Sequence, residues 1–265
     1  MKVYKNYFLD LDGVVYRGND LLPGARAFID WVESSGRQYL YLSNNSMSTP
    51  AEVAERLKRL GMPAPLERVI TAGSAAARYL GHTYPGARTY VLGLPPLAKM
   101  VAEAGLCVLS DAEGPQAEVV LVGLDRSLTY ARLSVAVQAV LNGAAFVTVN
   151  RDPLLPVEGK LEPGAGAVVA AVQASTGIAP YMVGKPEPGI IQEALAMIGA
   201  KPEETAMIGD GLTLDIPAGH RAGTATILLL SGITSKEEVA GAAIQPDAIY
   251  PDIAALLADA RSQAE

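Results

Sequence analysis

Short apolar runs alternate with longer amphipathic segments along most of the chain. The first run, Tyr7–Leu9, precedes the segment ARAFIDWVES, which follows Pro23 and Gly24 and has its apolar residues three or four positions apart. A second run, Gln38–Leu42, precedes another amphipathic segment that begins near Pro50. Short apolar runs predict buried strands, whereas apolar residues three or four positions apart predict helices that pack one face against a sheet. The order strand, helix, strand, helix predicts an α/β fold with a parallel sheet.

The same alternation continues through the middle and the last third of the chain. After the first two strand–helix units, we expect strands at Thr89–Leu92, Leu106–Leu109, Glu118–Val122, Ala145–Val149, Thr205–Asp210 and Thr226–Leu230. We expect helices at Ser74–Leu80, Leu97–Ala104, Tyr130–Leu141, Ala165–Ala174 and Ile190–Ile198, after Leu212 and at the C-terminus. The middle block holds enough strand–helix units for a core of its own. Because the connections are short, it is predicted to be an inserted domain.

Composition narrows the classes of function. Half of the 265 residues are hydrophobic and 18% are charged, as in a globular protein. No apolar run approaches the ~20 residues that span a bilayer, and the N-terminal segment has no apolar signal-peptide region. The formal net charge of −7 argues against nucleic-acid binding, which needs a basic face. We therefore expect a cytoplasmic protein with no nucleic-acid or membrane partner, and a buried thiol at the single cysteine, Cys107.

Two carboxylates, Asp10 and Asp12, follow the first predicted strand directly, and Gly13 begins a turn. In open α/β sheets, ligands bind just beyond the carboxyl ends of the strands. Two ionised carboxylates at ~4 Å repel each other by about 4 kcal/mol at an effective dielectric constant near 20. Either a cation lies between them or one of them stays protonated. A solvated, aspartate-rich turn is the alternative without a function.

Three further polar segments stand at predicted strand ends: Ser43-Asn44-Asn45, Lys185, and Asp210 with Asp215. Each alone has an ordinary explanation. Ser-Asn-Asn is a common turn, a lysine before proline is usually a surface charge, and Asp215 near a helix start favours the helix dipole. The occurrence of all four segments in this order, each where a strand meets a loop, indicates one site for phosphoryl transfer.

The residue types suit a carboxylate nucleophile. Attack of Asp10 on a phosphate monoester gives an aspartyl-phosphate. A carboxylate that approaches a phosphate dianion meets a repulsion of about 8 kcal/mol, which corresponds to about six decades in rate. A hard cation with oxygen ligands must therefore neutralise this charge, and Mg²⁺ fits, with Asp10 and Asp210 as ligands.

The remaining residues complete the predicted chemistry. Lys185 adds a positive charge close to the nucleophile and the phosphate. Ser43 and the N–H of Asn44 can donate hydrogen bonds to the transferring oxygens, and Asn45 belongs to the same substrate-binding segment. Asp12 is expected to protonate the leaving alcohol and then to activate water.

These segments resemble the four motifs of the haloacid-dehalogenase-like (HAD) phosphatase superfamily. The similarity extends over nearly the whole chain, and it is carried by FLDLDGVVYRG, LSNNS, VGLDRSLTYARL, PGAGAVVAA, VGKPEPGI and IGDGLTLDI. It points to the branch of NagD-like and 4-nitrophenylphosphatase-type enzymes, which have a large α/β cap between the second and third motifs. The resemblance implies that Asp12 binds Mg²⁺ through its main-chain carbonyl and that Asp215 supports the metal site from behind the direct ligands. Leu214 stands where this branch usually has a threonine.

The expected architecture is therefore an α/β Rossmann-like parallel-sheet core, residues 1–72 and 183–265, with an inserted α/β cap, residues 73–182. We expect a Mg²⁺-dependent phosphatase for small phosphorylated metabolites, such as sugar phosphates or nucleotide monophosphates. Two alternatives stay open: a phosphotransferase or mutase, in which another hydroxyl replaces water, and a non-catalytic phosphometabolite-binding protein.

The cap is expected to choose the substrate. Asn150, Arg151, Asp152 and the stretch Glu158–Glu162 are its most polar loop segments, so they are candidates for substrate contact. Solvated loops are the alternative interpretation of both segments. A homodimer formed through the cap is compatible with this organisation.

Overall fold

The computed structural model describes residues 2–157 and 160–263. By its contacts the chain divides into two compact units. The first unit contains Met1–Ser43, Pro50–Ile70 and Lys185–Glu265, and the second contains Asn44–Thr49 and Thr71–Gly184. The boundaries expected at 72/73 and 182/183 lie within two residues of the main divisions, whereas the short segment Asn44–Thr49 groups with the second unit.

The first unit is built on a sheet with the strand order β15-β14-β13-β1-β4-β5. The strands are β1 (Asn6–Leu9), β4 (Gln38–Ser43), β5 (Val69–Thr71), β13 (Thr205–Gly209), β14 (Ala225–Leu229) and β15 (Ala248–Tyr250). β1 pairs in parallel with β13 and with β4, so Leu9 lies opposite Ile208 and Tyr41. The carboxyl ends of β1, β13 and β4 therefore meet at one edge of the sheet, directly before Asp10, Asp210 and Asn44.

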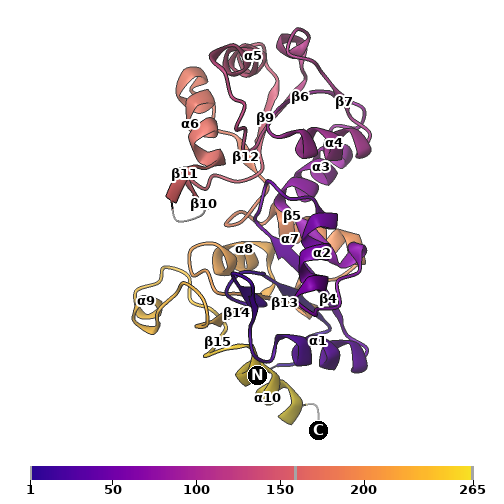
Figure 1. Cartoon of the computed structure of the whole chain (residues 1–265), viewed down its shortest axis with the longest axis vertical. Coiled ribbons are helices and arrows are strands. Elements are labelled where there is room, and N and C mark those ends of the chain that lie inside the picture. Colours follow the sequence, from indigo (N-terminus) through magenta and orange to yellow (C-terminus); the bar gives the residue numbers. More distant parts are fainter. Residues whose placement is uncertain (1, 158–159, 264–265) are drawn as a thin grey trace. The chain divides into compact units, whose positions relative to one another are not determined.

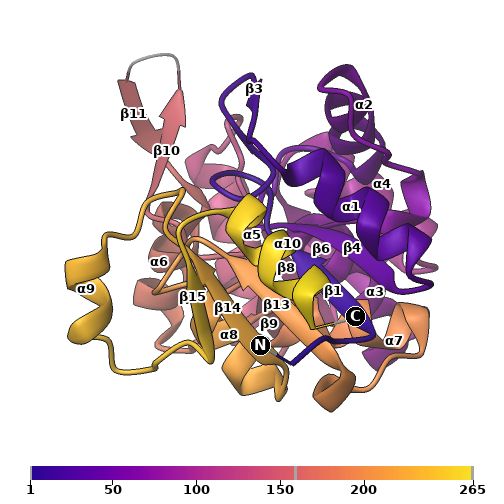
Figure 2. The same cartoon turned by 90° about the horizontal axis from the view of Figure 1, so that it is seen from below.

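Helices cover both faces of this sheet. α1 (Ala25–Ser34) contacts α10 (Ile253–Ser262) on one face, and α7 (Gly189–Ile198) contacts α8 (Asp215–Ala222) on the other (Figure 2). Alternate strand residues such as Tyr7 and Leu9 are fully buried on the α1 side, where the Tyr7 ring meets Phe28 edge to face at 5.3 Å. The unit also contains α2 (Pro50–Arg59), α9 (Lys236–Ala240), the short hairpin β2 (Tyr16–Arg17)–β3 (Asp20–Leu21), and the 3₁₀ turns Leu66–Arg68 and Pro202–Glu204.

The second unit, coloured from magenta to salmon in Figure 1, has a parallel sheet of its own. Its strand order is β12-β9-β8-β6-β7. The strands are β6 (Arg88–Leu92), β7 (Cys107–Val108), β8 (Val119–Val122), β9 (Ala145–Thr148) and β12 (Tyr181–Met182). α3 (Ala72–Thr83) packs with α4 (Pro95–Glu103), and α5 (Tyr130–Leu141) packs with α6 (Ala165–Thr176). An antiparallel hairpin, β10 (Leu154–Val157)–β11 (Lys160–Pro163), and the 3₁₀ turn Gly114–Gln116 complete the unit.

The structure confirms the predicted α/β class with parallel sheets, and it corrects several details. Cys107 is exposed rather than buried, because it lies on the two-residue edge strand β7. The stretch expected as a polar loop is partly strand β11, where Glu162 forms ion pairs with Arg126 and Lys160; Glu158 lies outside the described residues. Within the described part of the chain, every helix is too short or too polar to cross a bilayer.

Candidate active site

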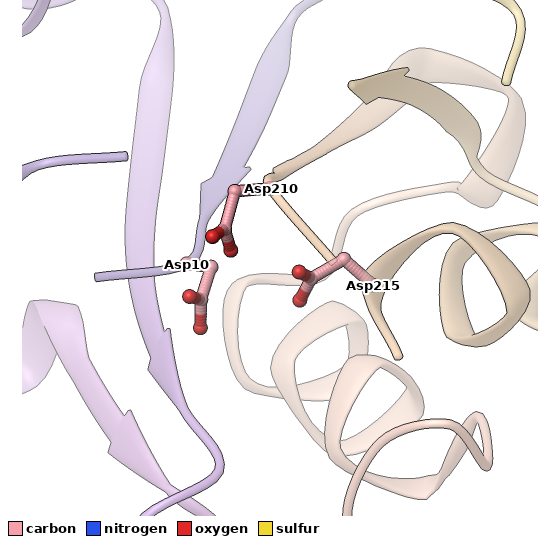
Figure 3. Close-up of side chains that lie close together, drawn as sticks. All are labelled: Asp10, Asp210 and Asp215. Carbon is pink, nitrogen blue, oxygen red and sulfur yellow. The ribbon is translucent and has the colours of Figure 1, made fainter. Parts of the chain in front are cut away.

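Three carboxylates gather at the carboxyl edge of the first unit's sheet. Asp10 follows β1, Asp210 follows β13, and Asp215 is the first residue of α8. The turn between the two later aspartates folds back through a hydrogen bond of 2.9 Å from the N–H of Asp215 to the carbonyl of Gly211. One oxygen from each carboxylate lies within 4.8 Å of the others, and the three side chains point toward a common space (Figure 3).

Lys185 joins two of these carboxylates. Its Nζ donates to Oδ1 of Asp10 at 2.5 Å and to Oδ1 of Asp215 at 2.6 Å, and the residue is 2% exposed. Three ionised carboxylates and one ammonium carry a net charge of −2, so the cluster lacks positive charge. The lysine that the sequence left open as a surface charge is therefore the buried centre of the site.

Hydrogen bonds divide the carboxylate oxygens into occupied and open ones. Both oxygens of Asp215 are occupied, one by Lys185 and the other by the N–H of Gly211 at 2.8 Å. Oδ2 of Asp210 accepts the N–H of Ile233 at 2.9 Å. Among the described residues, no donor from another residue reaches Oδ2 of Asp10 or Oδ1 of Asp210. These two oxygens are the ones available to a cation, whereas Asp215 holds the lysine.

Burial and the neighbouring charges together shift the pKa values of the site. Burial raises the pKa of Asp10 to about 7; Lys185 opposes this shift, and Asp215 and Asp210 add to it. Burial and the neighbouring Asp215 raise the pKa of Asp210 to about 6. Burial alone would lower the pKa of Lys185, but the two carboxylates in contact raise it above its usual range, so the ammonium stays charged. Carboxylates that resist ionisation beside open oxygens suit a hard divalent cation, because the cation stabilises the ionised forms.

Glycines allow the loops to approach the carboxylates this closely. Gly13 has a φ of 77°, and a Cβ at this position would overlap the Asp210 carboxylate. A Cβ on Gly232 would overlap the same side chain, and one on Gly209 would overlap Asp215. The packing around Asp210 therefore requires glycine on two different loops.

The segment Ser231–Thr234, which follows β14, holds Asp210 and was not predicted as part of the site. The Thr234 hydroxyl donates to the main-chain carbonyl of Asp210 at 2.6 Å, and the Ser231 hydroxyl donates to the carbonyl of Gly13 at 2.8 Å. The rule that ligands bind at strand ends could have found this segment, because Ser-Gly-Ile-Thr follows a predicted strand.

Asp12 and Ser43 also lie on the first unit. Asp12 is exposed, and its carboxylate forms no hydrogen bond with another described residue. The turn after it is closed by a bond of 2.8 Å from the N–H of Gly13 to the carbonyl of Tyr16. Ser43 is the last residue of β4 and is partly buried. Asp12 thus has the exposure that a proton donor to a bound substrate requires.

The other predicted residues belong to the second unit, where three of them meet. The side-chain amide of Asn150, 4% exposed, donates to the Asn44 carbonyl at 2.8 Å, and the Asn44 amide donates to Asp152 at 3.4 Å. The Asn45 side chain accepts the N–H of Met47 at 2.7 Å, as in an Asx turn. Arg151 is exposed and donates to the carbonyl of Pro180 at 3.2 Å. The buried amide of Asn150 therefore orients the main chain at Asn44.

Comparison with known proteins places this geometry in a family. A model described as haloacid dehalogenase-like hydrolase matches residues 7–107, and a HAD-hydrolase-like model matches residues 182–256. Together they include all four predicted motifs. The chain belongs to the haloacid dehalogenase-like hydrolase family.

Individual relatives then define the branch. An acid sugar phosphatase of Staphylococcus aureus (strain USA300) is 39% identical over 259 residues, 98% of this chain and 99% of the relative. NagD from E. coli K-12 has a TM-score of 0.87 at 33% identity and covers 96% of this chain and 98% of its own. A p-nitrophenyl phosphatase from Archaeoglobus fulgidus has a TM-score of 0.89 at 27% identity and covers 97% of this chain and 100% of its own. The predicted assignment to the NagD-like branch is confirmed.

Proposed function

We propose that this HAD-type phosphomonoesterase hydrolyses small phosphate monoesters with Mg²⁺, through an aspartyl-phosphate at Asp10. The observation that carries the proposal is the bridge from Lys185 to Asp10 and Asp215, beside open oxygens on Asp10 and Asp210. A nucleophile needs an unshared oxygen and a nearby positive charge, and Asp10 has both.

The donor set fits a magnesium ion. Asp10 and Asp210 would hold it, with the main-chain carbonyl of Asp12 as a third oxygen ligand. When bound, the cation neutralises the charge that builds up as a carboxylate approaches a phosphate dianion. Lys185 supplies a further positive charge, and Asp215 keeps this lysine in place.

The protein residues carry the two chemical steps. An oxygen of ionised Asp10 attacks the phosphorus, and the bond to the leaving alcohol breaks while Asp12 donates a proton to that oxygen. Asp12 then takes a proton from water, which attacks the phosphorus of the aspartyl-phosphate. Inorganic phosphate leaves and the Asp10 carboxylate is regenerated. Ser43 and the N–H of Asn44 donate to the phosphate oxygens in both steps.

Sugar phosphates are the proposed substrate class. The support is the 39% identity, over nearly the whole length of both chains, with a relative named acid sugar phosphatase. The second unit contributes none of the three clustered carboxylates, so we propose that it acts as the cap and chooses the leaving group. Arg151 and Asp152 are its proposed polar contacts. The proposed partner is accordingly a small phosphorylated metabolite.

A substrate panel tests the proposal. Phosphate release is measured for sugar phosphates, nucleotide monophosphates and 4-nitrophenyl phosphate, with Mg²⁺, after chelation, and with excess Ca²⁺. We expect activity only with Mg²⁺, inhibition by Ca²⁺ and the highest kcat/KM for sugar phosphates. Full activity after exhaustive chelation would refute the metal role of Asp210. Phosphate transfer to an added alcohol that outpaces release would favour a transferase, and binding without turnover would favour a phosphometabolite-binding protein.

A further inference from the structure

We propose that Thr234 is a positioning residue that sets the affinity of the carboxylate site for its divalent cation. The inference rests on the proposed Mg²⁺-dependent function. Thr234 lies in the Ser231–Thr234 segment after β14 and is 7% exposed.

One hydroxyl group closes the turn that presents Asp210. Oγ1 of Thr234 donates to the Asp210 carbonyl at 2.6 Å and accepts the N–H of Leu212 at 3.2 Å. The two main-chain groups lie on either side of Gly211. A single side-chain oxygen therefore fixes the backbone of the whole Asp210–Leu212 turn.

The fixed turn also controls the lysine bridge. The N–H of Gly211, between the two groups that Thr234 holds, donates to Oδ2 of Asp215 at 2.8 Å. Asp215 in turn holds Lys185 at 2.6 Å. Displacement of the turn would therefore move two carboxylates of the cluster together, although the hydrogen bonds of the Thr234 hydroxyl with described residues go to main-chain groups.

The preceding residue directs the Asp210 carboxylate. The N–H of Ile233 occupies Oδ2 of Asp210 at 2.9 Å, which leaves Oδ1 for a cation. Gly232 lies so close to this carboxylate that a Cβ would overlap it. The segment thus binds both the main chain and one side-chain oxygen of a proposed metal ligand. Loss of such supporting hydrogen bonds typically weakens metal binding by about 10–100-fold.

The test compares Thr234→Val, which keeps the shape and removes the hydroxyl, with Thr234→Ser, which keeps the hydroxyl. Thr224→Val is the matched control, because Thr224 is 6% exposed and donates a similar bond, 3.1 Å, to the Gly219 carbonyl at the opposite end of β14. Mg²⁺ affinity is measured by calorimetry without substrate, and Mn²⁺ affinity by electron paramagnetic resonance. If Thr234→Val does not fold, Thr234→Ala carries the same comparison with less bulk beside Asp210.

Thr234→Val is expected to raise the Kd for both ions by about tenfold or more, while Thr234→Ser stays within about threefold of the wild type. Thr224→Val should leave both Kd values unchanged even where its melting temperature falls equally. Wild-type affinity in Thr234→Val, or equal weakening in Thr224→Val, would overturn the inference. An unmutated protein that binds neither ion would instead overturn the proposed Mg²⁺-dependent function.

Discussion

Replacement of Lys185 by methionine tests the centre of the site most directly. Methionine fills much of the lysine's volume but carries no charge. The substitution leaves Asp10 and Asp215 without the ammonium that now contacts both at 2.5 and 2.6 Å. Because Lys185 is 2% exposed, water cannot take over its role without a rearrangement of the site.

Both rate and stability should fall. The attraction between one positive and one negative charge at ~4 Å is about 4 kcal/mol at an effective dielectric constant near 20. If the lysine stabilises the transferring phosphoryl group by that amount, its loss should lower kcat by about a thousandfold. Removal of one partner from a buried ion pair costs about 3–5 kcal/mol of unfolding free energy. Since Lys185 opposes the upward shift of the Asp10 pKa to about 7, its loss should raise that pKa further. Protonated Asp10 then relieves part of the stability loss at low pH.

The assay measures kcat/KM with saturating Mg²⁺, and the free energy of unfolding in urea at about pH 5.5 and about pH 8. The stability loss of Lys185→Met should be smaller at the lower pH. The matched control is Lys99→Met, because Lys99 is 75% exposed and pairs with Glu103 at 3.7 Å on the surface. Such exposed pairs contribute about 0–1 kcal/mol to stability, so neither kcat/KM nor the pH dependence of the free energy of unfolding should change in Lys99→Met. Activity within tenfold of the wild type, or an equal stability loss at both pH values, would refute the charge argument.

Three further predictions follow from the site. Asp10→Asn should abolish phosphate release, because an amide cannot be the nucleophile, while the melting temperature stays close to or above that of the wild type. More than a few per cent of activity in a pure sample would contradict the nucleophile assignment. The pKa values of Asp10 and Asp210 are about 7 and about 6, whereas an ordinary aspartate has 3.8. The folded, cation-free protein therefore binds protons that the unfolded chain releases, and its stability falls as the pH rises from about 4 to about 7. Mg²⁺ needs the ionised forms, so the rise in melting temperature that it causes should be larger at about pH 7.5 than at about pH 5.5, and an equal rise at both would count against these ligands. Arg151→Ala should lower kcat/KM for the preferred sugar phosphate, with a loss of about 1–3 kcal/mol of transition-state binding, and should lower kcat/KM for 4-nitrophenyl phosphate by less. A uniform loss would assign Arg151 to general catalysis, and no change would return it to the solvated-loop interpretation.

The central strands and their acidic ends could be predicted because each carries its own local signal. β1 is a short apolar run that ends at Asp10, and β13 is another that ends at Asp210. Because the strands of the sheet are parallel, both ends lie at the same edge of it. The edge strands β5 and β15 were missed because three residues are too few to show a period, and the exposed position of Cys107 depends on an edge that the pattern does not reveal.

Residues that support others were harder to predict than residues with their own chemistry. Thr234 can bond to the Asp210 carbonyl because β14 lies next to β13, and no local sequence pattern predicts this strand order. Asn150 was predicted from the polarity of its loop, but its burial and its bond to Asn44 join positions 106 residues apart. Tertiary packing determines both roles, so they became visible only in the folded chain.

The pairing of β1 with β13 has a consequence for synthesis. Asn6 lies opposite Thr205, so the central strand of the first unit pairs on one side with a strand made 199 residues later. At about 5–20 residues per second, a ribosome needs ~10–40 s to bridge that interval. During this time most of the second unit, Thr71–Gly184, has already left the ribosome and has its own sheet to form, while the apolar strand β1 keeps one edge without its partner. An unpaired apolar edge favours aggregation. We therefore expect the yield of folded protein to depend on what covers β1 until β13 is made.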